Sequence, residues 1–271
     1  MPNVWRLEVV RRLTRAPGAA LLILLLGIAP AHAAKCPRKG TLGTSRILKV
    51  DAVSFPQVGL KNFPQTLPLR DHEVVLTFDD GPWPPTTPKV LKALAQECVR
   101  ATFFLIGKPA SEHPDLVRRI AAEGHTVGHH TWLHRSLKQI PPSETTEEID
   151  HGISAVEMAL HGQATTTPST PFFRFPGFES TPATLDSLQA RGIVVFGADL
   201  WAGDWNKMTP QQELKLLIER LTVARKGIIL LHDPKAHTAA MLPAFLRWLR
   251  ENDYHIVHLV PTADPVSADG H

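Results

Sequence analysis

The sequence predicts an α/β protein in which parallel strands alternate with helices. From residue 72 onward, short β-branched and apolar stretches alternate with segments whose apolar residues recur at helical spacing. Threonine followed by proline favours a helix start, because threonine caps the helix and proline fits its first turn. Pairs of this kind precede three of the predicted helices, at residues 87–88, 181–182 and 209–210. The alternation predicts helices outside parallel strands, in a barrel or a doubly wound sheet.

The expected elements follow one another along a single core-forming region. Strands are expected at 73–78, 101–107, 125–130, 171–175, 193–199, 227–233 and 255–260. Helices are expected from residue 87, over 114–124, 143–160 and 181–192, from residue 209, and around 241–249. With 271 residues, 43% of them hydrophobic, the chain is long enough for one large core.

Residues 1–33 are predicted to be a signal peptide. Four arginines, at 6, 11, 12 and 15, precede an apolar run over 18–29 and the small-residue sequence "AHA" at 31–33. Cleavage is expected after Ala33; the alternative is an uncleaved anchor, although the run is short for a membrane span. The remaining chain divides into an extension or linker over 34–71 with a short strand at 45–51, a main domain over 72–262, and a flexible tail over 263–271.

The charge bears on the binding partners of the protein, and the cysteine content bears on its disulfide bonding. The net charge is +3, and much of the excess lies in the first forty residues, so no nucleic-acid partner is expected. Cys36 and Cys98 are the only cysteines. In an oxidising compartment they could form a disulfide between the mature N-terminus and the first helix, or remain two free thiols.

Reactive side chains cluster at the predicted strand ends, where both candidate architectures place their active sites. They are Asp79 and Asp80, His129, His130 and His134, Arg174, Asp199 and Asp204, and His232 and Asp233. Reactive polar side chains seldom occur by chance at the ends of five strands, so we expect one site on this rim.

A histidine pair and a carboxylate suggest a metal site. His130 and His134 are four residues apart, which on one helical turn would direct both imidazoles toward one divalent ion. Asp80 or Asp79 would complete a set of two histidines and one carboxylate. The rival pair, His125 and His129, belongs to a strand, where such spacing separates residues by well over about 10 Å.

The adjacent carboxylates of Asp79 and Asp80 repel each other unless a cation offsets the charge of one. The other is then free to act as a base toward a water molecule that the cation activates. Gly81-Pro82 ends the strand, so the two side chains need not point to opposite faces.

Five motifs, in order, resemble those of the polysaccharide deacetylase family, the NodB-homology domain of carbohydrate esterase family 4. They are "TFDDGP", "HTWLH", "FRFP", "GDW" and "ILLHD", within about residues 72–260. The resemblance implies a distorted barrel of about seven strand-helix units. It also implies one divalent metal ion, with Zn²⁺ expected and Co²⁺, Ni²⁺ or Mn²⁺ as alternatives.

The resemblance assigns a role to each matching residue. The metal ligands would be Asp80, His130 and His134. Asp79 would be the general base, oriented by Arg174, and His232 the general acid. Leu230 would wall the acetyl pocket, and the backbone N–H that follows Pro176, that of Gly177, would face the oxyanion.

Three positions depart from the family pattern, and one role has two candidates. Gly177 replaces the usual tyrosine after Pro176, His129 an asparagine, and Arg135 a proline. A carboxylate should hold His232 protonated; Asp199 ends a predicted strand, whereas Asp204 precedes Trp205 as in the fourth motif. We choose Asp204 and treat "LWAG" between them as a loop insertion.

The expected function is removal of acetyl groups from an N- or O-acetylated glycan, such as peptidoglycan or a chitin-like polymer, by a secreted or envelope-located monomer. The alternatives are an amide or imide hydrolase of the same fold acting on a small molecule, and a non-catalytic glycan-binding module. Four tryptophans near the motifs could stack on sugar rings or pack as wall residues. They are Trp83, Trp132, Trp201 and Trp205.

The signal-peptide assignment predicts the start of the mature protein. Because the cleavage pattern ends at Ala33, N-terminal sequencing of protein from the native envelope should begin near Ala34. An intact Met1 on that protein would contradict cleavage and favour the anchor.

Overall fold

The computed structural model describes residue 36 and residues 38–262. The predicted signal peptide (1–33) and tail (263–271) therefore lie outside the described residues. Within the described range, no helix combines the length and the apolar character that crossing a membrane requires.

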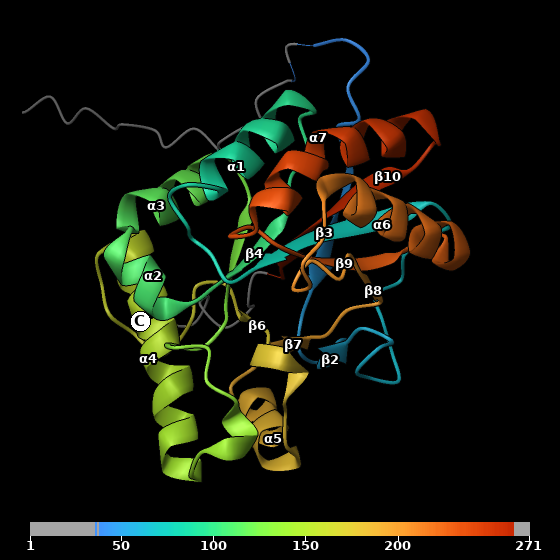
Figure 1. Cartoon of the computed structure of the whole chain (residues 1–271). Coiled ribbons are helices and arrows are strands. Elements are labelled where there is room, and N and C mark those ends of the chain that lie inside the picture. The colour runs from blue at the N-terminus through green and yellow to red at the C-terminus, as the bar shows by residue number, and fades with distance from the viewer. Residues whose placement is uncertain (1–35, 37, 263–271) are drawn as a thin grey trace, which may run out of the picture. The chain divides into compact units, whose positions relative to one another are not determined.

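Strands and helices alternate along the chain as expected (Figure 1). The strands are β1 (Thr44–Val50), β2 (Gln57–Val58), β3 (Glu73–Asp79), β4 (Thr102–Leu105), β5 (Thr126–His129), β6 (Phe172–Phe173), β7 (Val194–Phe196), β8 (Leu200–Trp201), β9 (Gly227–His232) and β10 (His255–Pro261). The helices are α1 (Thr87–Gln96), α2 (Gly107–Glu112), α3 (Pro114–Ala122), α4 (Pro142–His161), α5 (Pro182–Ala190), α6 (Pro210–Ala224) and α7 (Ala236–Glu251), with 3-10 turns η1 (Leu137–Gln139) and η2 (Pro176–Phe178).

The described strands pair in parallel and form one strongly curved sheet. Its order is β1-β10-β3-β4-β5-β6-β7-β2, and β9 pairs with both β3 and β8. Strand β3 is central, since it pairs with β9 along most of its length, with β10 near its start and with β4 near its end. This arrangement confirms the expected α/β barrel with parallel strands and helices.

The alternation of side chains along β3 determines the face on which Asp79 lies. Val74, Leu76 and Phe78 pack in the large core cluster that includes residues of α1 and α7. Val75 belongs to a second cluster with residues of β4, β6, β7 and β9. Because successive strand residues point to opposite faces, Asp79 shares the face of Val75. It therefore emerges inside the barrel at the carboxyl end of β3.

Three local expectations were wrong. The strand expected at 193–199 ends at Phe196, and "LWAG" is not a loop insertion, because Leu200–Trp201 form β8 beside β9. The strand expected at 101–107 ends at Leu105, and Gly107 begins an unpredicted helix, α2. Short strands at a barrel rim give too few alternating positions for their ends to be read from the sequence.

The segment 34–71 contributes to the sheet. β1 pairs with β10 over most of its length, and β2 pairs with β7. The short strand expected at 45–51 is thus present and continues the sheet beyond the boundary expected at residue 72.

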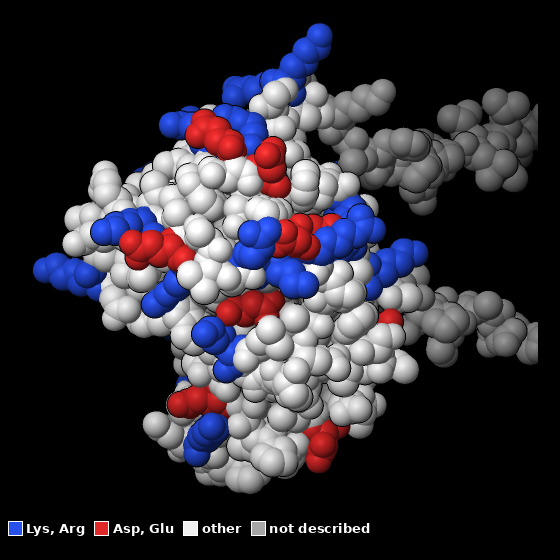
Figure 2. All heavy atoms as spheres, turned by 90° about the vertical axis from the view of Figure 1, so that its right-hand side faces the viewer, with Lys and Arg blue, Asp and Glu red and all other residues white. Residues whose placement is uncertain are grey.

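Basic and acidic side chains are interspersed on the face of the molecule in Figure 2. No region of one sign dominates that face among the described residues. This mixture accords with the nearly neutral charge of the sequence beyond its N-terminal region.

Cys36 and Cys98 form a disulfide, with their Cα atoms 5.6 Å apart. Of the two alternatives left open by the sequence, the structure therefore has the crosslink. It joins the chain ahead of β1 to the residues just after α1, as Gly43 N–H also does by donating to Glu97 O at 2.8 Å.

Replacing both cysteines by alanine should lower the free energy of unfolding. The crosslink spans 62 residues, and a loop of that length corresponds to about 4 kcal/mol of lost chain entropy in the unfolded state. Denaturant unfolding with and without a reductant measures the effect. A double-alanine variant as stable as the oxidised protein would contradict this role.

Candidate active site

The predicted site residues meet at the carboxyl ends of the strands, around a cavity of about 500 Å³. Its lining comes from β3, β8 and β9 and from the segments that follow β3, β5, β6, β8 and β9. The lining residues are Asp79, Asp80, His130, His134, Phe175, Gly177, Phe178, Trp201, Trp205, Leu230, His232 and Lys235.

Asp80, His130 and His134 form a compact group of potential metal ligands. One ligand atom from each lies within 4.8 Å of the others. The Nε2 atoms of His130 and His134 lie 3.4 and 3.3 Å from the same oxygen, Asp80 Oδ1. That oxygen is buried and has no hydrogen-bond partner among the described residues. Three converging donors with one unpartnered carboxylate oxygen fit a divalent cation.

The two histidines converge for a different reason from the one expected. Residues 130–134 form an irregular loop after β5, not a helical turn. Thr131 and His134 both have left-handed backbone conformations, with φ of 64° and 57°. This winding brings the two rings to a centroid separation of 4.9 Å. Asp80 also has a positive φ, 72°, which turns its carboxylate away from the strand direction and toward them.

Hydrogen bonds and burial prepare this group for a cation. His130 Nδ1–H donates to Arg174 O at 2.7 Å, which leaves Nε2 as the ligand atom. Burial and the neighbouring His130 lower the pKa of His134, so its neutral, ligating form is favoured. Burial opposes ionisation of Asp80, but the neighbouring His130, His232 and His134 outweigh it. The pKa of Asp80 consequently lies below its usual value.

Asp79 is held by a buried arginine. Arg174 is fully buried, and its Nη1 donates to Asp79 Oδ1 at 2.7 Å and to Thr77 Oγ1 at 2.8 Å. Its Nη2 donates to Gly197 O at 2.8 Å, and its guanidinium carbon lies 4.3 Å from the ring centre of Phe104. This pairing fixes the orientation of the Asp79 carboxylate at the end of β3.

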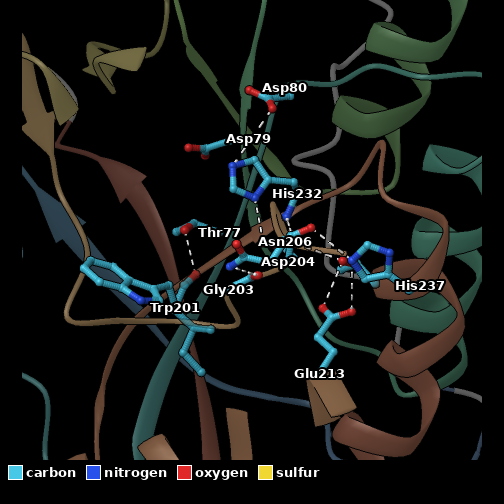
Figure 3. A network of polar contacts seen from close by, with 12 residues as sticks. Thr77, Asp79, Asp80, Trp201, Gly203, Asp204, Asn206, Glu213, His232 and His237 are labelled. Atoms are coloured by element: carbon cyan, nitrogen blue, oxygen red, sulfur yellow. Dashed lines mark hydrogen bonds and ion pairs between the residues drawn. The ribbon is translucent and has the colours of Figure 1, made fainter. Parts of the chain in front are cut away.

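His232 is paired with Asp204 on the other side of the cavity (Figure 3). His232 Nδ1–H donates to Asp204 Oδ1 at 2.8 Å, and the His232 backbone N–H donates to Oδ2 at 2.7 Å. Burial lowers the pKa of His232, but the hydrogen bond and charge of Asp204, with Asp79 and Asp80, raise it to about 9. The imidazole is therefore protonated at neutral pH.

Asp199, the rival for this position, lies elsewhere. Its carboxylate accepts from Leu60 N–H at 2.8 Å, from Thr66 Oγ1 at 2.8 Å and from Ile228 N–H at 2.7 Å. These bonds tie the segment before β3 to the start of β9, so Asp199 has a structural position and no contact with His232.

Aromatic and small residues form the cavity wall. Trp201 and Trp205 pack at a centroid distance of 5.8 Å, and Trp205 lies 6.1 Å from His232. Leu230 and Gly177 line the cavity, while Pro176 begins the 3-10 turn η2 that presents Gly177.

The other two tryptophans lie outside this lining. Trp132 stacks on His151 with centroids 3.8 Å apart, and Trp83 is partly exposed. They therefore have positions that suit packing more than contact with a bound ring in this cavity.

His125 and His129 lie outside the cavity lining, as their strand positions suggested. His125 Nδ1 accepts from the Ala101 N–H at 3.1 Å. His129 is fully buried, with Nε2 at 3.6 Å from Glu157 Oε1. Burial lowers the pKa of both histidines to about 3, so both are neutral packing residues.

Sequence reasoning left Phe178 and Thr238 out of the site and gave Asp233 no role in it. Phe178, one position after Gly177, supplies a wall aromatic near Trp201; the aromatic in "PGF" was a usable signal. Asp233 is buried against Gly81 and accepts a hydrogen bond from Thr87, which leaves no room for a side chain at Gly81. Thr238 donates to Asp204 from α7, a contact between distant segments that no local pattern indicates.

A candidate base and a candidate acid thus face a metal-type triad on one barrel rim, which defines the class of protein as a hydrolase. The family model for polysaccharide deacetylase matches residues 67–196. A peptidoglycan-N-acetylglucosamine deacetylase of Bacillus cereus is 30% identical over 244 residues, 87% of each chain. A chitooligosaccharide deacetylase of a Bradyrhizobium strain is 34% identical over 161 residues, 59% of this chain and 70% of that protein.

Solved structures give the same result. The peptidoglycan deacetylase Bd3279 of Bdellovibrio bacteriovorus superposes with a TM-score of 0.72 and 28% identity, over 84% of this chain and 62% of that one. The family 4 carbohydrate esterase of Streptomyces lividans, in complex with acetate, gives 0.56 and 32%, over 70% and 92%. The chain belongs to the polysaccharide deacetylase family.

The matches cover different shares of the relatives. The chain spans only 30% of a Bacillus cereus peptidoglycan-N-acetylglucosamine deacetylase in a segment of 48% identity. It spans 37% of PgdA, the corresponding deacetylase of Listeria monocytogenes.

We expect different effects when Asp204 and Asp199 are each replaced by asparagine. Asp204→Asn should move the alkaline limb of the pH–rate profile toward lower pH, to or below the ordinary histidine pKa of about 6.5, because His232 loses its partner. Asp199→Asn should leave that limb in place but lower the free energy of unfolding by about 1–3 kcal/mol. Acetate-release rates across pH and denaturant unfolding measure both; the reverse pattern would exchange the assignments.

Proposed function

We propose that this protein removes the acetyl group from N-acetylglucosamine units of a glycan, either peptidoglycan or a chitin-like oligomer. The observation that carries the proposal is the pairing of Asp79 with Arg174 and of His232 with Asp204 around one cavity. Relatives named for these two substrates support the choice of glycan.

Asp79 would act as the general base. Its carboxylate is buried beside the Arg174 guanidinium, which fixes its orientation, and it lines the cavity. From there it would take a proton from the water that attacks the acetyl carbonyl. A divalent cation held by Asp80, His130 and His134 would supply Lewis-acid activation of the water and the carbonyl.

His232 would act as the general acid. Asp204 keeps its imidazole protonated and fixes the ring through Nδ1, so Nε2 is the atom free to give a proton. Nε2 faces the cavity, 4.0 Å from Asp80 Oδ2. There it would protonate the leaving amine, which keeps the glucosamine product from departing as an amide anion.

The backbone and wall would position the acetyl group. Gly177 N–H, in η2, would donate to the oxygen that becomes negative during attack. Leu230 and Trp205 would contact the acetyl methyl, since both line the cavity beside His232. The missing tyrosine side chain at position 177 leaves this backbone donor intact.

Two alternatives have less support. A small-molecule amide or imide hydrolase of this fold does not need the open aromatic wall formed by Trp201 and Trp205. A non-catalytic module does not need a buried base and a paired acid. We further propose that the protein acts outside the cytoplasm, on the basis of its N-terminal sequence and the disulfide.

Metal dependence gives the decisive test. Chelated protein and His134→Ala should both lose acetate release from chitooligosaccharides and peptidoglycan, and Zn²⁺ should restore only the chelated protein. Asp79→Asn should lower kcat by about 10²–10⁴-fold with metal still bound. His255→Ala, which removes an exposed histidine on β10, is the matched control and should behave as wild type. Full activity after exhaustive chelation, with the metal content measured, would overturn the proposal.

A further inference from the structure

A buried carboxyl group lies behind the Asp204–His232 pair (Figure 3). Glu213, in the first turn of α6, is fully buried and is not part of the cavity lining. Thr238 of α7 stands between the two acids, with Oγ1 at 2.9 Å from Asp204 Oδ2 and at 2.9 Å from Glu213 Oε1. If Glu213 were ionised so near the Asp204 carboxylate, the two negative charges would repel each other; a protonated Glu213 avoids this repulsion.

We propose that Glu213 is a neutral carboxylic acid that positions Asp204, and through it His232, by way of Thr238. The catalytic consequence of this inference rests on the proposed deacetylase function. The protonation state itself is a property of the folded chain and can be tested without activity.

Counting hydrogens supports a proton on Glu213. The Thr238 hydroxyl carries one hydrogen but lies at hydrogen-bond distance from two carboxyl oxygens. With both acids ionised, one of these contacts would join two oxygens with no hydrogen between them. With Glu213 protonated, its O–H donates to Thr238 and Thr238 donates to Asp204, so each contact has a hydrogen.

The surroundings of Glu213 give its charge no adequate partner. Glu213 Oε2 is buried and without a hydrogen-bond partner among the described residues. His237 Nε2 is 3.7 Å from it and lies closer to Asp204 O, at 3.0 Å. Among the described residues, the other charges that act on the Glu213 pKa are those of Asp204 and, beyond it, His232. A neutral oxygen tolerates this environment better than an ionised one.

The direction of the Glu213 pKa shift agrees with this geometry. Burial raises the pKa of Glu213 and the charge of Asp204 raises it further, against the Thr238 hydrogen bond, to about 7. The N-terminus of α6 favours the anion, but does not offset burial. Since the folded pKa exceeds the unfolded one, Glu213 stabilises the fold at low pH, and this contribution is lost as pH rises toward and through 7.

The test compares Glu213→Gln, which keeps an N–H donor and cannot ionise, with Glu213→Ala. Glu219→Gln, an exposed acid on the same helix, is the matched control. The infrared difference between wild type and Glu213→Gln at pH 6 should show one neutral carboxyl band that is lost. The denaturation midpoint of wild type should fall relative to that of Glu213→Gln between pH 5 and 8, whereas Glu219→Gln should follow wild type.

Activity tests the positioning role. Glu213→Ala should lower kcat about 10–100-fold with KM unchanged, as loss of a supporting partner typically does, and Glu213→Gln should recover most of that loss. Absence of the infrared band, or a glutamine variant as impaired as the alanine variant, would overturn the proposal. Wild-type protein that releases no acetate would refute the deacetylase function, while the band and the midpoints would still decide the charge of Glu213.

Discussion

The buried pairing of Arg174 with Asp79 is the interaction on which the rest of the site depends. One residue acts here in two ways: its guanidinium holds the candidate base at the end of β3, and its carbonyl fixes His130. Burying both charges is costly, and removing either partner alone would leave an uncompensated charge in the barrel. The guanidinium also donates hydrogen bonds to Thr77 Oγ1 and Gly197 O, and it lies over the ring of Phe104.

The two sides of the cavity use charge in opposite ways. A buried cation pairs with the candidate base, and a buried anion keeps the candidate acid protonated. Each pair joins opposite charges, so both candidate groups can lie near the same metal-type triad. Separate partners for acid and base are what allow one cavity to give and take protons at the same pH.

Much of this arrangement could be predicted from the sequence because strand ends are local signals. Asp79, His232 and Arg174 each follow an apolar run, and parallel strands bring such ends to one rim. His134 was predicted with the wrong geometry, since positive φ at Thr131 is set by packing: a side chain on Gly152 would collide with Thr131. Glu213 and Thr238 were not predictable, because their contact joins two helices whose relative placement no spacing rule fixes.

The position of the acid has a consequence for how relatives of this protein are recognised. The family match ends at residue 196, yet Asp204 and His232 both come later in the chain, on the segments around β8 and β9. The matched part therefore contains the candidate base, its arginine and the candidate ligand triad, but not the candidate proton donor. A protein that resembles this one only over that part would carry the features that identify the family while leaving open whether it can complete the reaction. Changes in those later segments would leave the part of the chain that the family model matches unaltered.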